Sequence, residues 1–203
     1  QALDYDSGKI MRINDDGSIP QDNPFVGQTD KNPQIYAYGF RNVTGLAWHP
    51  ETGELWGTEI GPMGGDELNI IRPGANYGWP LVSLGLMYGS SLPSGQSWYR
   101  PDMEMPEMYW MPAISPGSVM FYTGDVYPQW NGHVFVGALG GQMLQRAAFN
   151  HPPPQTQRRD AMFIDMHARF RDVKQGPDGY IYVLTEQRPG RNTGAVYRIE
   201  PAN

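Results

Sequence analysis

With 203 residues, the chain is long enough for one large domain or two small ones. Its 25 glycines, 19 prolines and 12% aromatic residues, against only 18% charged residues, favour short strands joined by turns over a helical protein. A net charge of -6 argues against a nucleic-acid-binding surface, and no apolar run approaches the roughly 20 residues that span a bilayer. Cysteine is absent, which excludes disulfides and thiolate metal sites.

Strand-like runs recur along the chain, each bounded by Gly, Pro, Asn or Asp. In chain order, the expected strands are residues 8–14, 45–50, 54–60, 117–124, 133–139, 143–149, 169–176, 180–186 and 195–201. Glycine-containing turns, "HPETGE" and "GPDG", predict that 45–50 pairs with 54–60 and that 169–175 pairs with 180–186 as hairpins.

Comparable strand pairs are spaced by roughly forty to fifty residues, the length of a four-stranded propeller blade. We therefore expect an all-β fold, a partial β-propeller of about three to four blades forming a single domain over residues 1–203. On composition alone, a β-sandwich is the alternative. Because an incomplete ring leaves strand edges open, the chain is expected to be a fragment or to self-associate with a second copy.

The segment Glu59–Pro80, "EIGPMGGDELNIIRPGANYGWP", stands apart from this strand pattern. It places five glycines and three prolines around a single apolar pair, Ile70 and Ile71. Such a composition predicts a long irregular loop rather than a helix or a regular strand. From spacing alone, a surface loop with solvated acidic side chains is the simpler interpretation.

Four motifs carry a resemblance to a known family: "YGFRN" (38–42), "GPMGGDELN" (61–69), "NYGWP" (76–80) and "RFRDVKQGPDGYIYVLT" (169–185). They resemble the soluble glucose/sorbosone (aldose sugar) dehydrogenases that use pyrroloquinoline quinone, PQQ. The resemblance runs along nearly the whole chain, in family order. It implies a six-bladed β-propeller with the cofactor on its top face, of which this chain corresponds to roughly the C-terminal half to three-fifths.

The resemblance implies two calcium sites in the Gly- and Pro-rich loop. The carbonyl groups of Gly61 and Pro62 would bind the calcium ion beside PQQ. Glu67 and Tyr77, the latter through its carbonyl, would hold a second, structural calcium ion. Calcium takes oxygen ligands at about 2.3–2.6 Å, and a loop rich in Gly and Pro can turn carbonyl groups toward an ion without side-chain obstruction.

Arg169 and Arg171 are spaced i, i+2 on an expected strand, so both point to one face while Phe170 points to the other. The resemblance places these two arginines at the carboxylates of PQQ, which paired guanidinium groups suit. Strand alternation alone would equally produce two solvated charges on an exposed face.

Arg41 and Asn42 match a family Arg-Asn pair beside the quinone, where Arg41 would stabilise developing negative charge during catalysis. The resemblance places further cofactor contacts at Tyr88, Ala138 and Leu139. A family lysine that follows the last two is replaced here by Gly140.

The family's general base is a histidine from a blade upstream of Gln1. The four histidines of this chain, His49, His133, His151 and His167, lie outside that motif. Each is expected to be a neutral surface residue.

The expected activity is oxidation of an aldose sugar at its anomeric carbon to a lactone, with hydride transfer to calcium-bound PQQ and an external electron acceptor. We expect a small-molecule substrate, no nucleic acid, no membrane insertion, and a periplasmic or secreted location. A non-catalytic calcium-binding partial propeller that self-associates is the alternative. A calcium-bearing hydrolase of the lactonase kind is less favoured, because only Asp66 and Glu67 cluster in the sequence.

Overall fold

The computed structural model describes residues 1–150, 155–186 and 194–201, and within them strands form four antiparallel sheets with no α-helix. The first sheet pairs β1 (Lys9–Met11) with β2 (Ile35–Tyr38). The second sheet has the order β3 (Val43–Trp48), β4 (Leu55–Glu59), β5 (Asp66–Ile71) and β6 (Met108–Trp110).

The third and fourth sheets follow in the same manner. The third contains β7 (Pro116–Phe121), β8 (Val134–Ala138), β9 (Met143–Asn150) and β10 (Gln155–Met162). The fourth contains β11 (Arg169–Gln175), β12 (Ile181–Glu186) and β13 (Ala195–Arg198). Two short 3-10 turns, η1 (Pro128–Trp130) and η2 (Ile164–Met166), lie between strands. No helix in this part of the chain is long and apolar enough to cross a membrane.

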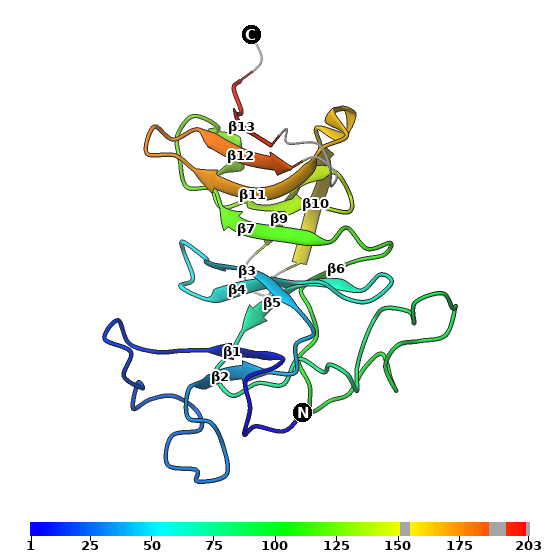
Figure 1. Ribbon diagram of the computed structural model, residues 1–203. Helices are drawn as coiled ribbons and strands as arrows, with labels where there is room; N and C mark the ends of the chain where they lie inside the picture. The colour runs from blue at the N-terminus through cyan, green and yellow to red at the C-terminus, as the bar shows by residue number, and fades with distance from the viewer. Residues whose placement is uncertain (151–154, 187–193, 202–203) are drawn as a thin grey trace.

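The four sheets follow one another through the molecule in chain order (Figure 1). Strand β3 lies against β7, and β7 lies against β11, so the first strands of the last three sheets are neighbours. Successive antiparallel sheets that meet along their first strands are the arrangement of propeller blades, so the fold is a partial β-propeller.

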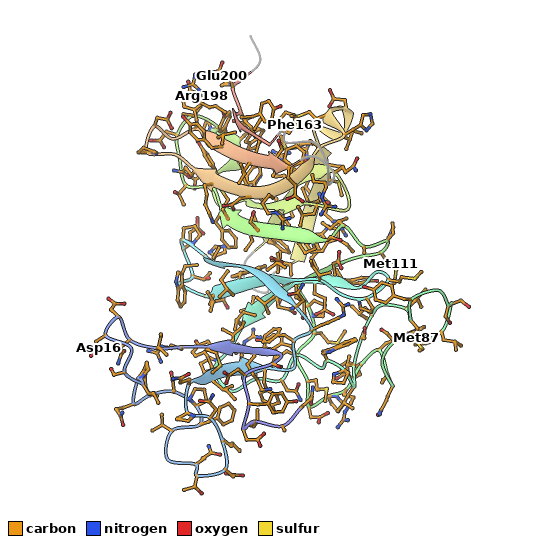
Figure 2. All side chains as sticks on the ribbon, viewed as in Figure 1. Asp16, Met87, Met111, Phe163, Arg198 and Glu200 are labelled. Atoms are coloured by element: carbon orange, nitrogen blue, oxygen red, sulfur yellow. The ribbon has the colours of Figure 1, made fainter. Side chains whose placement is uncertain are left out.

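Side chains fill the space between successive sheets (Figure 2), and the buried ones there are mainly apolar. Trp56, Trp110 and Val134 are almost fully buried between the second and third sheets. Phe135 and Phe170 are fully buried between the third and fourth. Each such side chain contributes about 1.5–3 kcal/mol through burial, which holds the sheets in a fixed order.

All nine predicted strands and both predicted hairpins are confirmed. The prediction of a long irregular loop over Glu59–Pro80 is wrong in part, because β5 (Asp66–Ile71) lies inside it. Strand β5 is the third strand of its sheet and is buried on both faces, so it lacks the alternation that marks a half-exposed strand. The sequence reasoning also missed β2, β6 and β10.

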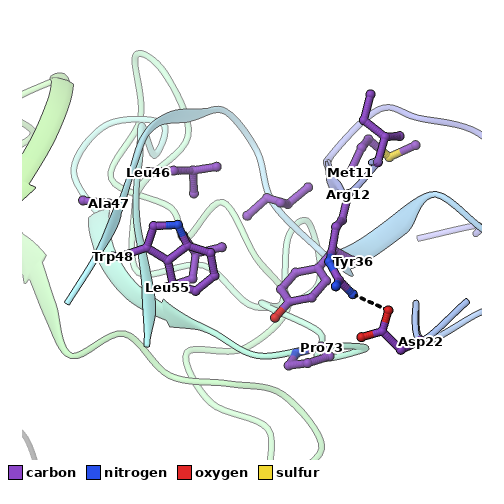
Figure 3. Close-up of a pocket in the computed structure, with 11 residues that line it drawn as sticks. Met11, Arg12, Asp22, Tyr36, Leu46, Ala47, Trp48, Leu55 and Pro73 are labelled. Atoms are coloured by element: carbon purple, nitrogen blue, oxygen red, sulfur yellow. Dashed lines mark hydrogen bonds and ion pairs between the residues drawn. The ribbon is translucent and has the colours of Figure 1, made fainter. Parts of the chain in front are cut away.

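A groove of about 550 Å³ lies between the first two sheets (Figure 3). Leu46 and Trp48 of β3 line it and are 46% and 65% exposed. An ion pair between Arg12 and Asp22, 3.0 Å long, lies at its side. Within the described residues, β1 has a partner along one edge only, so this groove adjoins an open sheet edge.

Candidate functional site

The candidate residues come from strand ends that share one rim of the propeller. Antiparallel pairing sets the start of one strand opposite the end of the next, and these ends meet in the pairs Val43–Glu59, Glu59–Glu67, Pro116–Ala138 and Arg169–Glu186. Hydrogen bonds from Ile114 and Ser115 to Asp66, and from Arg169 to Leu139, join these ends across sheets. The rim therefore brings together residues that lie more than 100 positions apart in the sequence.

A small cavity opens between β4, β5 and the chain that follows β5. We call it the rim cavity; it is lined by Arg41, Glu59, Gly61, Pro62, Gly65, Glu67, Tyr77, Trp79, Val82 and Ser83. Its volume of about 10 Å³ is close to the roughly 10–15 Å³ that one water molecule requires. The structure thus places all four candidate metal-binding residues around a space the size of a single water or ion.

Two carboxyl groups face each other beside this space. Glu59, only 5% exposed, lies opposite Glu67 in the β4–β5 ladder, and their side chains are hydrogen-bonded. Burial raises the pKa of Glu59 well above its usual value, and the charge of Glu67 raises it further. Burial likewise raises the pKa of Glu67 to about 7. Without a cation between them, the two groups retain a proton that solvated carboxylates would have lost at neutral pH.

Asn69 adds a further oxygen to this acidic pair. Its Nδ2 donates to Glu59 Oε1 at 3.4 Å and to Glu67 Oε2 at 3.2 Å. Its Oδ1 is buried and has no partner within the described residues. Sequence reasoning missed both Glu59 and Asn69, because nothing local to either residue reveals that β4 and β5 bring them together.

Arg41 connects the rim cavity to Tyr88. Its Nη1 donates to the carbonyl of Ile60 at 3.0 Å and to that of Gly61 at 2.9 Å, and its Nη2 donates to the Tyr88 hydroxyl at 3.1 Å. The Arg41 backbone N–H donates to Glu59 Oε2 at 2.8 Å. Arg41, Gly61 and Tyr88 therefore form one group, although they lie in three separate segments.

Tyr77 lines the rim cavity, and Asn42 contacts one of its lining residues, Glu59. The Tyr77 hydroxyl donates to the Ile70 carbonyl at 2.6 Å, and its ring stacks on Phe40 with centroids 4.5 Å apart. These contacts fix the ring in the core, and the residue still lines the rim cavity. The side chain of Asn42 is exposed, whereas its backbone N–H donates to Glu59.

Arg169 and Arg171, which we call the arginine pair, lie on one side of β11 and share a single carboxylate. Arg169 Nε donates to Glu186 Oε1 at 2.8 Å, and Arg171 Nη2 donates to Glu186 Oε2 at 2.7 Å. Phe170 between them is fully buried, as the predicted alternation requires. Hydrogen bonds from both arginines lower the pKa of Glu186. Glu186 is the last residue of β12, and it was missed from the sequence because only the β11–β12 pairing places it opposite Arg169.

Ala138 and Leu139 are buried, so their side chains do not reach the surface of the rim. The Leu139 carbonyl accepts a hydrogen bond of 3.4 Å from Arg169 Nη1, which ties this segment to the arginine pair. A Cβ atom at Gly140 would stand 2.8 Å from Ser115 Oγ. The close approach of Ser115 explains why glycine is suited to this position, where the family resemblance leads one to expect lysine.

The prediction that every histidine is a surface residue is wrong for His49. His49 is 3% exposed and lies 4.6 Å from the Phe121 ring, while its Nδ1 accepts the backbone N–H groups of Glu51 and Thr52. Phe121 of the neighbouring third sheet packs against His49. The turn motif "HPETGE", which begins at His49, gave no sign of this contact. His167 is exposed, His133 is half-buried, and His151 lies outside the described residues.

A metal ion at this rim would depend on backbone and amide oxygens as well as carboxylates. Across the described ranges, no group of three or more His, Cys, Asp or Glu side chains is arranged to hold a metal ion. Hard cations such as calcium accept carbonyl and amide oxygens readily, so a site with two carboxylates remains chemically suitable.

Comparison with known proteins gives consistent results. A model of the glucose/sorbosone dehydrogenase family matches residues 1–198. Aldose sugar dehydrogenase YliI of Escherichia coli strain K12 is 38% identical over 204 residues, which cover 100% of this chain and 53% of that protein. The chain spans about half the length of the curated relatives it matches.

Two solved structures extend this similarity to the fold. A glucose dehydrogenase superimposes with a TM-score of 0.91 at 37% identity, covering 100% of this chain and 56% of that one. The PQQ-bound form of an aldose sugar dehydrogenase from Streptomyces coelicolor superimposes with a TM-score of 0.69 at 27% identity, covering 95% of this chain and 52% of that one. The predicted all-β propeller fold is thereby confirmed.

Proposed function

Because the chain belongs to the glucose/sorbosone dehydrogenase family, we propose that it forms part of a sugar oxidoreductase. The proposed reaction oxidises the anomeric carbon of an aldose to a lactone, with hydride transfer to calcium-bound PQQ. The observation that carries this proposal is the single rim that joins the acidic pair Glu59–Glu67, Arg41 and the arginine pair. A rim with a buried negative end and a positive end suits a divalent cation together with an anionic quinone.

The acidic side of the rim cavity fits a calcium ion. The buried Glu59 lies against the half-buried Glu67, and the Asn69 Oδ1 is buried without a partner in the described residues. A divalent cation would replace the shared proton and offset the repulsion between the carboxylates. We propose that Glu67 and the carbonyl of Tyr77 hold a structural calcium ion there, with Glu59 and Asn69 adjacent.

The Gly61 side of the rim cavity is a less direct fit. The Gly61 carbonyl accepts a hydrogen bond of 2.9 Å from Arg41, so a cation at this oxygen would share it with a guanidinium group. We propose that Gly61 and Pro62 present carbonyl oxygens to the calcium ion beside the cofactor when Arg41 turns toward the quinone. When bound, calcium supplies Lewis acidity and PQQ supplies the hydride-accepting carbonyl.

The arginine pair fits a carboxylate, because it already binds one. Glu186 occupies Nε of both arginines and Nη2 of Arg171. Arg169 Nη2 and Arg171 Nη1 have no partner within the described residues, so each guanidinium retains a donor for a ligand. We propose that these groups bind carboxylates of PQQ, and that the backbones of Ala138 and Leu139 and the exposed ring of Tyr88 border the cofactor.

The remaining catalytic roles fall to Arg41 and Asn42. Arg41 lies at the rim cavity, where its guanidinium group would stabilise an oxygen that becomes negative during hydride transfer. Asn42 directly precedes β3 and is exposed, and its side chain would donate a hydrogen bond at the same rim. The electron acceptor that reoxidises the cofactor is proposed to be external.

A non-catalytic calcium-binding role is the second candidate, and one observation favours it. No histidine of the described residues lines the rim cavity, so the proposed general base is not among its side chains. The acidic pair would bind calcium in either case. Only turnover separates the two candidates.

Two assays test these proposals. Titration of the metal-free protein with PQQ, with and without calcium, should give a calcium-dependent change in the quinone absorbance. No change would contradict the cofactor proposal. Dye reduction with glucose and other aldoses, in the presence of both PQQ and calcium, should then detect turnover. Binding without turnover would support the non-catalytic role.

We also propose that two copies associate through open sheet edges. The groove beside β1 exposes Leu46 and Trp48, and an open edge next to apolar surface favours pairing with another chain. Light scattering should therefore give a mass of at least two chains, and Trp48→Lys should lower it. A monodisperse monomer would contradict this proposal.

The family resemblance further supports a periplasmic or secreted location, which we propose for this protein. Fractionation of cells that express the natural gene, followed by detection of the protein in the periplasm or medium, tests this location. Recovery in the cytoplasmic fraction alone would contradict it.

A further inference from the structure

Asp66, the first residue of β5, has no solvent exposure and uses its carboxylate to join two segments of the rim. Its Oδ1 accepts the backbone N–H of Gly61 at 2.9 Å. Its Oδ2 accepts the backbone N–H groups of Ile114 and Ser115 at 2.7 and 2.6 Å. Strand alternation turns Asp66 away from the neighbouring Glu67, so Asp66 does not belong to the acidic pair.

On one side, Asp66 fixes the peptide that begins the Gly61–Pro62 corner. The Gly61 N–H is bound by Asp66 and the Gly61 carbonyl by Arg41. A Cβ atom at Gly61 would stand 2.3 Å from the Gly65 carbonyl, so the peptide is also packed tightly against the turn behind it. The direction of the carbonyl oxygens that face the rim cavity therefore depends on the bond from Gly61 to Asp66.

On the other side, Asp66 fixes the segment that precedes β7. Ser115 has a φ of 50°, a left-handed conformation that costs a non-glycine residue energy unless its surroundings hold it. The Ser115 carbonyl accepts the Leu139 N–H at 2.9 Å, and the Leu139 carbonyl accepts Arg169 Nη1 at 3.4 Å. A continuous series of hydrogen bonds thus leads from Asp66 to the arginine pair.

We propose that Asp66 is a positioning residue that couples the rim cavity to the arginine pair. Its carboxylate fixes the distance and orientation between the Gly61 corner and the Ile114–Ser115 segment. A cation in the rim cavity and an anion at Arg169 are therefore bound at a fixed separation. This inference rests on the proposed function, because it concerns the same cation and cofactor. A carboxylate that merely stabilised a turn would not need donors from both the Gly61 corner and the Ile114–Ser115 segment.

The test is Asp66→Asn in the full chain, with the calcium affinity measured by isothermal titration calorimetry. Asparagine has the same shape but offers one acceptor oxygen, so either Gly61 or the Ile114–Ser115 pair loses its bond. Loss of a group that orients metal ligands typically lowers metal affinity about 10–100-fold, and we expect a decrease of that size. Affinity for PQQ in saturating calcium should also fall.

Asp160→Asn is the matched control. Asp160 pairs with Arg146 and Arg158 on β9 and β10, away from the rim cavity. This variant should lower the melting temperature while leaving calcium affinity within about twofold of wild type. A folded Asp66→Asn protein that behaves in the same way, with a lower melting temperature and unchanged calcium affinity, would overturn the proposal.

A second measurement on the wild-type protein applies even if Asp66→Asn does not fold. Calcium should slow backbone amide hydrogen exchange at Ile114, Ser115 and Leu139, which lie outside the rim cavity, and leave β10 unchanged. If calcium slowed amide exchange only at residues that line the rim cavity, the proposal would be overturned. A wild-type protein that binds no calcium would overturn both this inference and the proposed function, whereas normal wild-type binding with an unaffected variant would overturn the inference alone.

Discussion

The two charged regions of the rim contrast in how their charges are balanced. In the rim cavity, the buried Glu59 lies against the half-buried Glu67, and the pKa of both is raised. In the arginine pair, two guanidinium groups share Glu186, and the three side chains are 32–46% exposed. The rim cavity brings two acidic groups together without a cation, whereas the arginine pair has an opposite charge beside it and is partly exposed to solvent.

The contrast shows which region depends on a ligand. Buried like charges cannot be relieved by solvent, so the acidic pair retains a proton until a cation replaces it. The arginine pair is satisfied in the absence of any ligand, because water and Glu186 already stabilise it. We therefore expect changes in the rim cavity to have larger effects than changes at the arginine pair.

The largest expected effect is a pH dependence of the calcium-free protein. The pKa of Glu67 is about 7 in the folded state and about 4.5 when unfolded, so the folded state holds the proton more tightly. The resulting stability is fully present below pH 4.5 and is lost as the pH rises through 7. At 1.36 kcal/mol per pKa unit, the free energy of unfolding should fall by about 3 kcal/mol over this window. Urea denaturation with a chelator measures this fall, and a flat or rising profile would contradict it.

Glu67→Gln should have the next largest effect, a decrease in calcium affinity of about 100-fold, because the variant removes one of two carboxylates near the ion. The same variant should reduce the pH-dependent fall in stability without abolishing it, because burial also raises the pKa of Glu59. Calorimetric titration measures the affinity, with Glu104→Gln as the control, since Glu104 lies in an exposed ion pair with Arg72. Equal affinities in the two variants would place the calcium ion elsewhere.

Arg169→Ala should weaken PQQ binding about 10–100-fold and leave calcium affinity unchanged, since a charge-assisted hydrogen bond contributes about 1.5–3 kcal/mol. Arg171→Ala should behave alike. Arg158→Ala, a change to another arginine on an outer strand, is the matched control. Wild-type PQQ affinity in both rim variants would show that the arginine pair does not bind the cofactor.

The smallest effect is expected at Glu186. Glu186→Gln removes a half-exposed negative charge beside the arginine pair, and exposed pairs contribute about 0–1 kcal/mol, so PQQ should bind up to about 5-fold more tightly. The gain should shrink at high salt because exposed charges are screened. Weaker binding would show instead that Glu186 is needed to align the two guanidinium groups.

Strands with alternating apolar residues could be predicted from the sequence, because one face of each is buried and the other is half-exposed. Residues 180–186 are an example: Ile181, Val183 and Thr185 are buried and the residues between them are not. Strand β5 escaped prediction because both of its faces are buried, and β10, "QTQRRDAM", escaped because its polar composition gives no apolar pattern.

The candidate site divides in the same way. Residues in motifs, such as Gly61, Glu67 and Arg169, could be named from the sequence through the family resemblance. Glu59, Asp66 and Glu186 could not be assigned roles, because each acts through a partner that only strand register or packing between sheets brings near. Glu59 in particular is buried by neighbouring segments of the fold, and the sequence of β4 alone would also allow an outward-facing side chain.

The most direct test of the account is a crystal structure of the protein grown with calcium and PQQ. We expect a calcium ion in the rim cavity, about 2.3–2.6 Å from a Glu67 carboxylate oxygen and the Tyr77 carbonyl oxygen. We also expect a carboxylate of the quinone on the guanidinium groups of Arg169 and Arg171. Calcium bound away from Glu67, or a quinone that leaves both arginines in contact with Glu186 alone, would contradict the account.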